Sequence, residues 1–327
     1  MSGILVEARN LSRVFPAAGG KAMHAVSGVN LQIHEGETLG LVGESGCGKS
    51  TLGRLLLRAM EPSGGEVLFR GQSVTAMSGK DFRPLRREMQ LVFQDPYASL
   101  DPRMTVRDLI AEPIEAWRLC PNRAAVTERV KELMGAVGVP EEFLYRYPHQ
   151  FSGGQRQRIG IARAIAADPA FIVCDEPVSA LDVSVQNQIL NLLKELKNTR
   201  GLTYLFISHD LSVVRYLADR VCVMFLGKIC ESGPVEAVYN HPRHPYTRFL
   251  LDAVPLPDPS LRGREIRLLQ GEPPSPADPP SGCRFRTRCP YAQPKCAEEE
   301  PALRETGGVL AACHFPRERK VSLEKNG

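Results

Sequence analysis

The residues best suited to chemistry lie in a glycine-rich segment near the N-terminus. Residues 43–50, GESGCGKS, match the pattern G-x-x-x-x-G-K-[ST], in which glycines let backbone N–H groups wrap around phosphate oxygens. Lys49 offers a positive charge to the β- and γ-phosphates of a nucleotide, and the Ser50 hydroxyl can coordinate Mg²⁺. A glycine-rich turn with a chance lysine is the alternative. However, a strand expected over 38–42 and a helix expected from residue 49 to about residue 57 frame the loop as a phosphate site requires.

Two further segments could serve the same phosphates. The apolar run 171–174 ends in Asp175 and Glu176. A carboxylate delivered by a strand beside a phosphate loop suits Mg²⁺, and the next carboxylate can orient a water molecule, although many strands end in charged surface residues. In residues 151–158, FSGGQRQR, Ser152 stands where a helix N-cap belongs, and the glycines after it leave backbone N–H groups exposed. This segment predicts a second phosphate-binding surface.

Strands and helices must position these residues. Over the first 250 residues short apolar runs alternate with helical patterns, which predicts an α/β protein. Between about 95 and 167 the pattern is helical without strands, which predicts a helical insertion. Eight of the 26 prolines fall between 254 and 282, where proline blocks regular ladders. We therefore expect a large α/β domain over 1–250 and a small Pro- and Cys-rich C-terminal domain over 251–327. Strands are expected at 38–42, 66–70, 89–93, 171–174, 204–207 and 221–226, and helices in the insertion at 106–117, 124–137 and from 155 onward.

The composition predicts an ordinary soluble globular protein, with 43% hydrophobic and 24% charged residues among 327. The net charge of +4, from 41 Lys and Arg against 37 Asp and Glu, is too small for a chain that coats nucleic acid. The longest apolar run, 221–226, is far short of the ~20 residues of a membrane helix, and the N-terminus lacks the pattern of a secretory signal. We expect a cytoplasmic protein with no nucleic-acid partner.

Four of the nine cysteines cluster in the C-terminal region, where Cys283, Cys289, Cys296 and Cys313 are separated by five, six and sixteen residues. In a reducing compartment such a cluster predicts a metal centre rather than disulfides. Zinc sites usually contain pairs about two to four residues apart, so the longer spacers favour a [4Fe–4S] cluster. Zinc is the second interpretation, and free structural thiols are the third. A cluster would mainly cross-link a segment with too few apolar residues to fold alone.

Cys47 is a separate case because it lies inside the phosphate loop. Lys49 and a helix N-terminus, its expected neighbours, both lower the pKa of a thiol. Oxidation of this thiol could gate the site, but the interpretation that we favour is that cysteine merely serves as a small residue in place of serine or alanine.

The motifs together resemble those of an ABC-transporter ATPase subunit. GESGCGKST, FQDPYASLDP, FSGGQRQR, IVCDEPVSALD and ISHD occur in the family's order, and the resemblance extends from about residue 4 to 314. TLGRLLL, SHDLSVV, HPRHPYT and the cysteine-bearing tail resemble the dipeptide/oligopeptide importer branch, in particular the second of its two ATPase subunits. The resemblance implies a P-loop, RecA-like core, with ATP and Mg²⁺ as ligands and an iron-sulfur cluster in the tail.

The resemblance also implies a role for each matching residue. Gln94 would contact Mg²⁺ and the attacking water, Glu176 would act as general base, and His209 would contact the γ-phosphate. Phe15 would stack on adenine, although a core phenylalanine is the alternative, and Asp182 would lie at a dimer seam. Mg²⁺ would be held through Ser50, Gln94 and Asp175. The remaining ATP contacts would come from Gly43, Glu44, Ser45, Gly46, Cys47, Gly48, Lys49 and Thr51, with Ser152, Gly153, Gly154 and Gln155 capping the ATP of the opposite subunit.

The implied partners are a second ABC ATPase that completes a heterodimer, two membrane permease subunits and an extracytoplasmic substrate-binding protein. The chain would act at the cytoplasmic face of the inner membrane and energise import of di- or oligopeptides. Near 94–102, Tyr97, Ala98 and Leu100 could form an apolar patch for the permeases, or could simply pack the helical insertion. Glutathione, a nickel chelate or haem are alternative cargoes. Two further alternatives concern the function of the whole chain. One is a soluble ABC ATPase of DNA repair or translation, and the other is a redox protein with an incidental ATPase.

Overall fold

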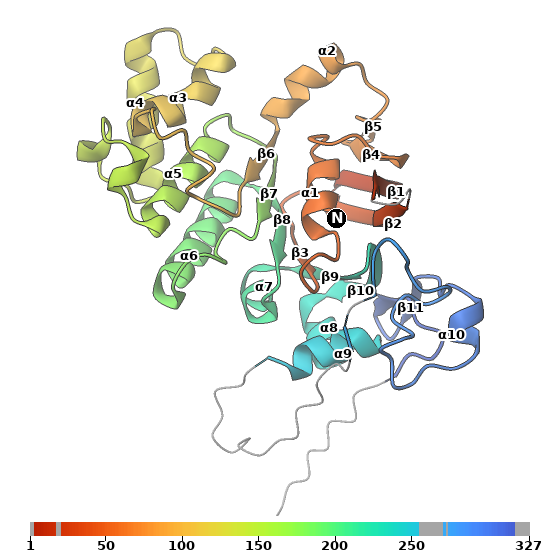
Figure 1. The fold of residues 1–327 in the computed structure, drawn as a ribbon. Helices are drawn as coiled ribbons and strands as arrows, with labels where there is room; N and C mark the ends of the chain where they lie inside the picture. The colour runs from red at the N-terminus through yellow and green to blue at the C-terminus, as the bar shows by residue number, and fades with distance from the viewer. Residues whose placement is uncertain (1–2, 18–20, 255–270, 273, 318–327) are drawn as a thin grey trace, which may run out of the picture.

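The strands form two sheets in the computed structural model, which describes residues 3–17, 21–254, 271–272 and 274–317 (Figure 1). Within these residues, one sheet has eight strands in the order β11-β12-β10-β9-β3-β8-β7-β6, and the other has four in the order β2-β1-β4-β5. The α/β prediction is confirmed. The larger sheet contains β3 (Thr38–Val42), β6 (Met89–Val92), β7 (Phe171–Asp175), β8 (Thr203–Ser208), β9 (Arg220–Phe225), β10 (Lys228–Pro234), β11 (Arg304–Thr306) and β12 (Val309–Ala311); the smaller contains β1 (Ile4–Pro16), β2 (Ala22–His34), β4 (Gly64–Phe69) and β5 (Gln72–Ser73).

The centre of the larger sheet is parallel, from β6 through β7, β8 and β3 to β9. Every residue of β3, β7 and β8 is buried. Strands covered on both faces read as continuous apolar runs rather than alternating ones, which is why the sequence revealed them. The smaller, antiparallel sheet begins with a hairpin of two 13-residue strands that the sequence analysis did not anticipate, because bulges interrupt their alternation.

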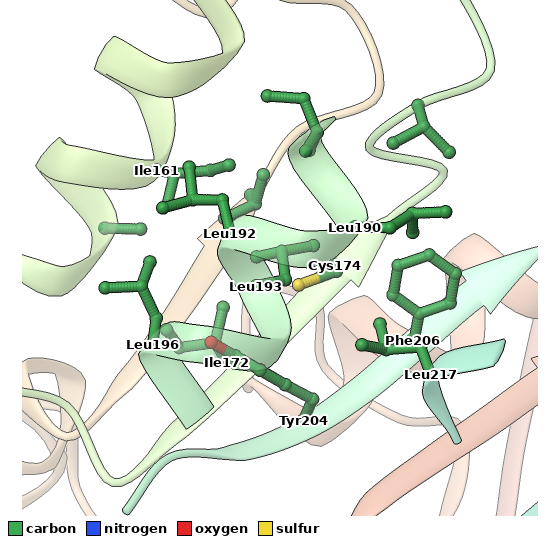
Figure 2. Close-up of a cluster of buried hydrophobic side chains, with 14 of the residues drawn as sticks. Ile161, Ile172, Cys174, Leu190, Leu192, Leu193, Leu196, Tyr204, Phe206 and Leu217 are labelled. Atoms are coloured by element: carbon green, nitrogen blue, oxygen red, sulfur yellow. The ribbon is translucent and has the colours of Figure 1, made fainter. Parts of the chain in front are cut away.

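Helix α6 (Val183–Arg200) covers one face of the parallel strands (Figure 2). Leu193, which is 1% exposed, lies in a cluster with Cys174 of β7 and Phe206 of β8. Helix α1 (Lys49–Leu56) contacts β7 and β8 and belongs to the second core cluster. Since helices pack against the strands, the sheet is a rigid platform for the loops at its ends.

The expected helical insertion is present and consists of α3 (Val106–Ala116), α4 (Arg123–Ala136) and α5 (Gly153–Ile165). These helices pack on one another and lie on the opposite side of the molecule from the smaller sheet (Figure 1). Among the helices of the described residues, none combines the length and apolar character needed to cross a membrane. The other helices are α2 (Gly79–Phe82), α7 (Leu211–Leu217), α8 (Val235–Asn240), α9 (Pro245–Asp252) and α10 (Lys295–Glu298), with 3-10 helices η2 (Arg83–Arg87), η3 (Glu141–Phe143) and η4 (Pro148–Gln150).

The C-terminal region is joined to the large α/β domain by strand pairing and by aromatic packing. Strand β12 pairs with the edge strand β10, so the tail extends the larger sheet, and the side chain of Phe285 is buried against Phe225 and Tyr246. The tail contains two three-residue strands, β11 and β12, which pair with each other, and β12 also pairs with β10. Residues 255–270 and 273 of the proline-rich stretch lie outside the described residues.

Candidate functional site

The glycine-rich loop runs from the end of β3 to the start of α1, as predicted. Two of its glycines cannot be replaced without steric conflict. A Cβ on Gly43 would lie 2.1 Å from the carbonyl oxygen of Met224, and one on Gly48 would lie 2.1 Å from that of Ala25. Gly48 also has a φ of 106°, a conformation that favours glycine. The loop is therefore wedged against β2 and β9, and its backbone is fixed before any ligand arrives.

Lys49 is buried, and its ammonium group is satisfied by the loop itself. Its Nζ donates hydrogen bonds to the carbonyl oxygens of Gly43 (2.8 Å) and Glu44 (3.0 Å). A cation held over exposed N–H groups at a helix N-terminus is suited to bind phosphate. The phosphate oxygens of a bound polyphosphate would replace these carbonyl oxygens as hydrogen-bond acceptors of Lys49 Nζ.

A serine and an aspartate from distant segments meet beside the loop. Ser50 Oγ donates a hydrogen bond of 2.7 Å to Asp175 Oδ1, at the end of β7. Burial raises the pKa of Asp175, while the Ser50 hydrogen bond and the charge of Arg54 oppose that rise. A hydroxyl and a buried carboxylate are the hard oxygen donors that Mg²⁺ prefers, so this pair fits the predicted ion.

The carboxylate of Glu176 is held by two side chains from other strand ends. Gln94 Nε2, after β6, donates a hydrogen bond of 3.2 Å to Glu176 Oε2, and His209 Nδ1, after β8, lies 3.2 Å from the same oxygen. Glu176 adopts a φ of 45°, an uncommon conformation for a residue with a side chain. The structure thus brings together Ser50, Gln94, Asp175, Glu176 and His209. Of the predicted Mg²⁺ residues, Gln94 contacts Glu176 rather than Asp175.

The segment predicted to form a second phosphate-binding surface lies at the N-terminus of α5 and forms hydrogen bonds within its own turn. Ser152 Oγ accepts from the N–H of Gln155 (3.4 Å), and the Gln155 side chain accepts from the N–H of Ser152 (3.1 Å), which confirms the predicted N-cap. Gly154 packs against Val185 of α6, where a Cβ would lie 2.3 Å from Cγ1. Asp182, the N-cap of α6, is therefore close to this segment. Its pKa is lowered by hydrogen bonds from Ser184 and the N–H of Val185.

Two other predicted residues have environments that bear on their roles. Phe15 is half-buried near the end of β1, and the guanidinium carbon of Arg13 lies 4.7 Å from its ring centre. Cys47 is 6% exposed, and burial raises the pKa of its thiol despite the opposing charge of Lys49. The expectation of a lowered pKa was wrong, because desolvation of a thiolate outweighs the nearby cation.

The four C-terminal cysteines line one small cavity of about 20 Å³, together with His244. Burial raises the pKa of Cys283 and Cys289, and that of Cys313 to about 11, so these thiols carry no charge near neutral pH. Within the described ranges, no set of three or more His, Cys, Asp or Glu side chains is arranged to hold a metal ion. The four thiols therefore share one cavity.

Two residues that the sequence analysis missed contact the phosphate loop at Glu44. Arg288 forms an ion pair with the Glu44 carboxylate (2.8 Å), and Tyr246 Oη accepts a hydrogen bond from the Glu44 N–H (2.9 Å). Arg288 and Glu44 are 244 positions apart. No local pattern could have linked them, and the HPYT segment that contains Tyr246 was noted only for its resemblance.

Comparison with known proteins shows which family the chain is similar to. The family model described as ABC transporter matches residues 26–179, and that described as oligopeptide/dipeptide transporter, C-terminal region, matches residues 230–296. The chain is 52% identical to the oligopeptide transport ATP-binding protein OppF of Salmonella typhimurium, over 90% of this chain and 88% of that protein. It is 49% identical to AppF of Bacillus subtilis, over 95% and 97%. A dimeric ATP-binding cassette, MJ0796, solved with ADP and Pi, superimposes with a TM-score of 0.65 at 30% identity, covering 71% of this chain and 99% of that one.

The raised pKa and burial of Cys47 predict a slow thiol. At pH 7.5 we expect iodoacetamide to alkylate Cys47 at least ~10-fold more slowly in the folded chain than in urea, because the thiolate is the nucleophile. Mass spectrometry of the labelled peptides measures this, with the half-buried Cys120 as internal comparison. Cys47→Ala should leave the sensitivity of ATP hydrolysis to peroxide unchanged. Labelling of Cys47 as fast as that of Cys120 would contradict the assignment.

Proposed function

This chain belongs to the ATP-binding proteins of oligopeptide ABC transporters, and from that membership we infer that it hydrolyses ATP to energise peptide import across the inner membrane. The observation that carries the proposal is the group of side chains at one edge of the larger sheet. Ser50 contacts Asp175, while Gln94 and His209 both lie against Glu176. Such a set provides charge and positioning without a covalent nucleophile, which is what phosphoryl transfer requires.

In the proposed mechanism, the loop N–H groups and Lys49 bind the β- and γ-phosphates. Mg²⁺, held by Ser50 and Asp175 with Gln94 nearby, would neutralise charge on the phosphates. Glu176 orients the attacking water and accepts its proton. His209, whose Nδ1 lies 3.2 Å from Glu176 Oε2, would contact the γ-phosphate. Phe15 would stack on the adenine ring. The guanidinium group of Arg13 lies over the Phe15 ring in the structure.

A second ATPase subunit would complete each site. The N-terminus of α5, with Ser152 and Gly153, would cap the γ-phosphate bound to the partner's loop, and Asp182 would lie at the seam. Two observations support this: the segment is preorganised by its capping box, and the superimposed cassette MJ0796 is a dimer with ADP and Pi. Closing both surfaces on ATP excludes water and strengthens charge contacts. A related but different ATPase, rather than a second copy, is the proposed partner.

Membrane permeases and an extracytoplasmic binding protein would supply the path and the peptide specificity, so this chain would act at the cytoplasmic face of the membrane. A groove of about 840 Å³ between the core and the helical insertion, lined by Phe93, Gln94, Ala98 and Trp117, is the proposed permease contact. Of the expected apolar patch, Ala98 lines this groove, whereas Tyr97 is 59% exposed outside it and Leu100 is 2% exposed and packs in the core. Because Gln94 borders both the groove and Glu176, movement of a permease segment could reach the ATP site.

The part of the chain beyond about residue 250 is proposed to form the C-terminal domain, joined to the larger sheet through β12, and to hold a [4Fe–4S] cluster, with zinc as the alternative. Cys283, Cys289, Cys296 and Cys313 share one cavity, which supports a common ligand. Their number fits either group, although the described geometry is not that of a metal site. A cluster would cross-link the tail, and no step of the ATPase reaction depends on it.

Glu176→Gln should retain ATP while lowering hydrolysis by ~10²–10⁴-fold, because the amide cannot accept the proton of water. Lys49→Ala should instead weaken ATP binding. Phosphate release and retained labelled ATP, measured in the assembled complex, separate the two effects. Glu236→Gln, at an exposed carboxylate paired with Arg215, is the control expected to hydrolyse normally. Near-normal turnover in Glu176→Gln would refute its role.

Purification of the tagged chain from membranes should recover a related ATPase, two membrane proteins and a peptide-loaded binding protein, identified by mass spectrometry. Phe93→Asp, in the groove, should release the membrane proteins but keep the second ATPase. Tyr145→Asp, at an exposed aromatic outside the groove, should keep both. Recovery of this chain alone, or with a second copy only, would contradict the proposed assembly.

Anaerobic purification should yield brown protein with about four irons and four sulfides per chain. Cys289→Ser and Cys313→Ser should lose both, and Cys120→Ser, at a half-buried cysteine outside the cavity, should not. Iron, sulfide and zinc analyses distinguish a [4Fe–4S] cluster from a zinc ion at these cysteines. Colourless protein with one zinc and no sulfide would replace the cluster by zinc and leave the ATPase proposal intact.

A further inference from the structure

Glu44 is the acidic residue of the phosphate loop GESGCGKS, and three neighbours fix it. Its carbonyl oxygen accepts a hydrogen bond from Lys49 Nζ at 3.0 Å, and its N–H donates one to Tyr246 Oη at 2.9 Å. Arg288 Nη1 lies 2.8 and 3.1 Å from its two carboxylate oxygens. Two of these three neighbours come from the C-terminal part of the chain.

The ion pair is shielded from water more than an ordinary surface pair. The side chain of Arg288 is 7% exposed, and that of Glu44 is 26% exposed. A charge pair in such surroundings is screened less by salt than an exposed pair. Without Arg288, the loop would present a carboxylate beside the place where a polyanion binds, and like charges near one site disfavour each other.

The segment that carries Arg288 is fixed to the core by a second arginine. Arg284 donates hydrogen bonds to the carbonyl oxygen of Leu226 and to Ser27 Oγ (3.0 Å). The adjacent residues Cys283 and Cys289 line the cysteine cavity. This short segment therefore directs Arg284 and Arg288 toward the ATPase core, while Cys283 and Cys289 face the cysteine cavity. Such anchoring makes the position of Arg288 a fixed property of the fold.

We propose that Arg288 is a positioning residue for ATP: it neutralises Glu44 and holds the carboxylate away from the phosphates. The inference rests on the proposed binding of ATP at this loop. It assigns to the C-terminal region a part in nucleotide affinity, in addition to any ligand of its cysteines. Arg288 would act on ATP through Glu44, which makes it a positioning residue rather than a catalytic one.

Calorimetric titration of the full chain with Mg²⁺-ATP and Mg²⁺-ADP tests this. Arg288→Met should weaken ATP binding about tenfold and ADP binding less, because ATP carries more charge. The loss should shrink as salt rises from 50 to 500 mM, since salt screens the repulsion. Glu44→Gln added to Arg288→Met should restore most of the affinity, a non-additivity expected of directly paired residues. Arg286→Met, whose arginine bonds to Ser281 within the tail, is the matched control and should bind ATP as the parent does.

Arg288→Lys keeps the positive charge and serves if the methionine variant does not fold, as judged by circular dichroism; it should stay within a few-fold of the parent. Unchanged affinity in Arg288→Met, an equal loss in Arg286→Met, or a loss that Glu44→Gln does not relieve would overturn the inference and leave the proposed function standing. Failure of the parent chain to bind ATP would overturn both.

Discussion

The register of the parallel strands is the constraint on which the site depends. Val42 of β3 pairs with Ser208 of β8, Ile207 pairs with Asp175 of β7, and Cys174 pairs with Val92 of β6. The residues that follow these pairs therefore emerge at one level: the phosphate loop after β3, His209 after β8, Glu176 after β7 and Gln94 after β6. Slipping one strand by a single residue would turn its side chains to the opposite face and separate the group.

The polar groups of the site are satisfied within the protein while no nucleotide is bound. Lys49 donates to loop carbonyls, the Ser50 hydroxyl donates to Asp175, and Glu176 accepts from Gln94. Buried polar groups are costly when they lack partners, so these contacts stabilise the folded site. Binding of ATP would be an exchange of hydrogen-bond partners on a preformed frame, which needs little backbone movement.

The sequence predicted those parts of the molecule that depend on neighbouring residues. The bounds of β3, the start of α1 and the cap at Ser152 follow from local patterns, and the motifs identified each residue of the Glu176 group. The contact of Arg288 with Glu44 joins segments 244 positions apart, so no spacing reveals it. Cys47 shows a different limit. Its charged neighbours are visible in the sequence, whereas the burial that decides its pKa exists only in the folded chain.

The pairing of β12 with β10 has a consequence for synthesis of the chain. While the ribosome is still making the tail, β10 has β9 on one side and an open row of N–H and C=O groups on the other. Such an edge is a template for pairing with strands of other chains. The ATPase core can therefore fold early but stays prone to aggregation until residues 304–311 have emerged. Nascent chains that stop short of this hairpin would be natural substrates for chaperones.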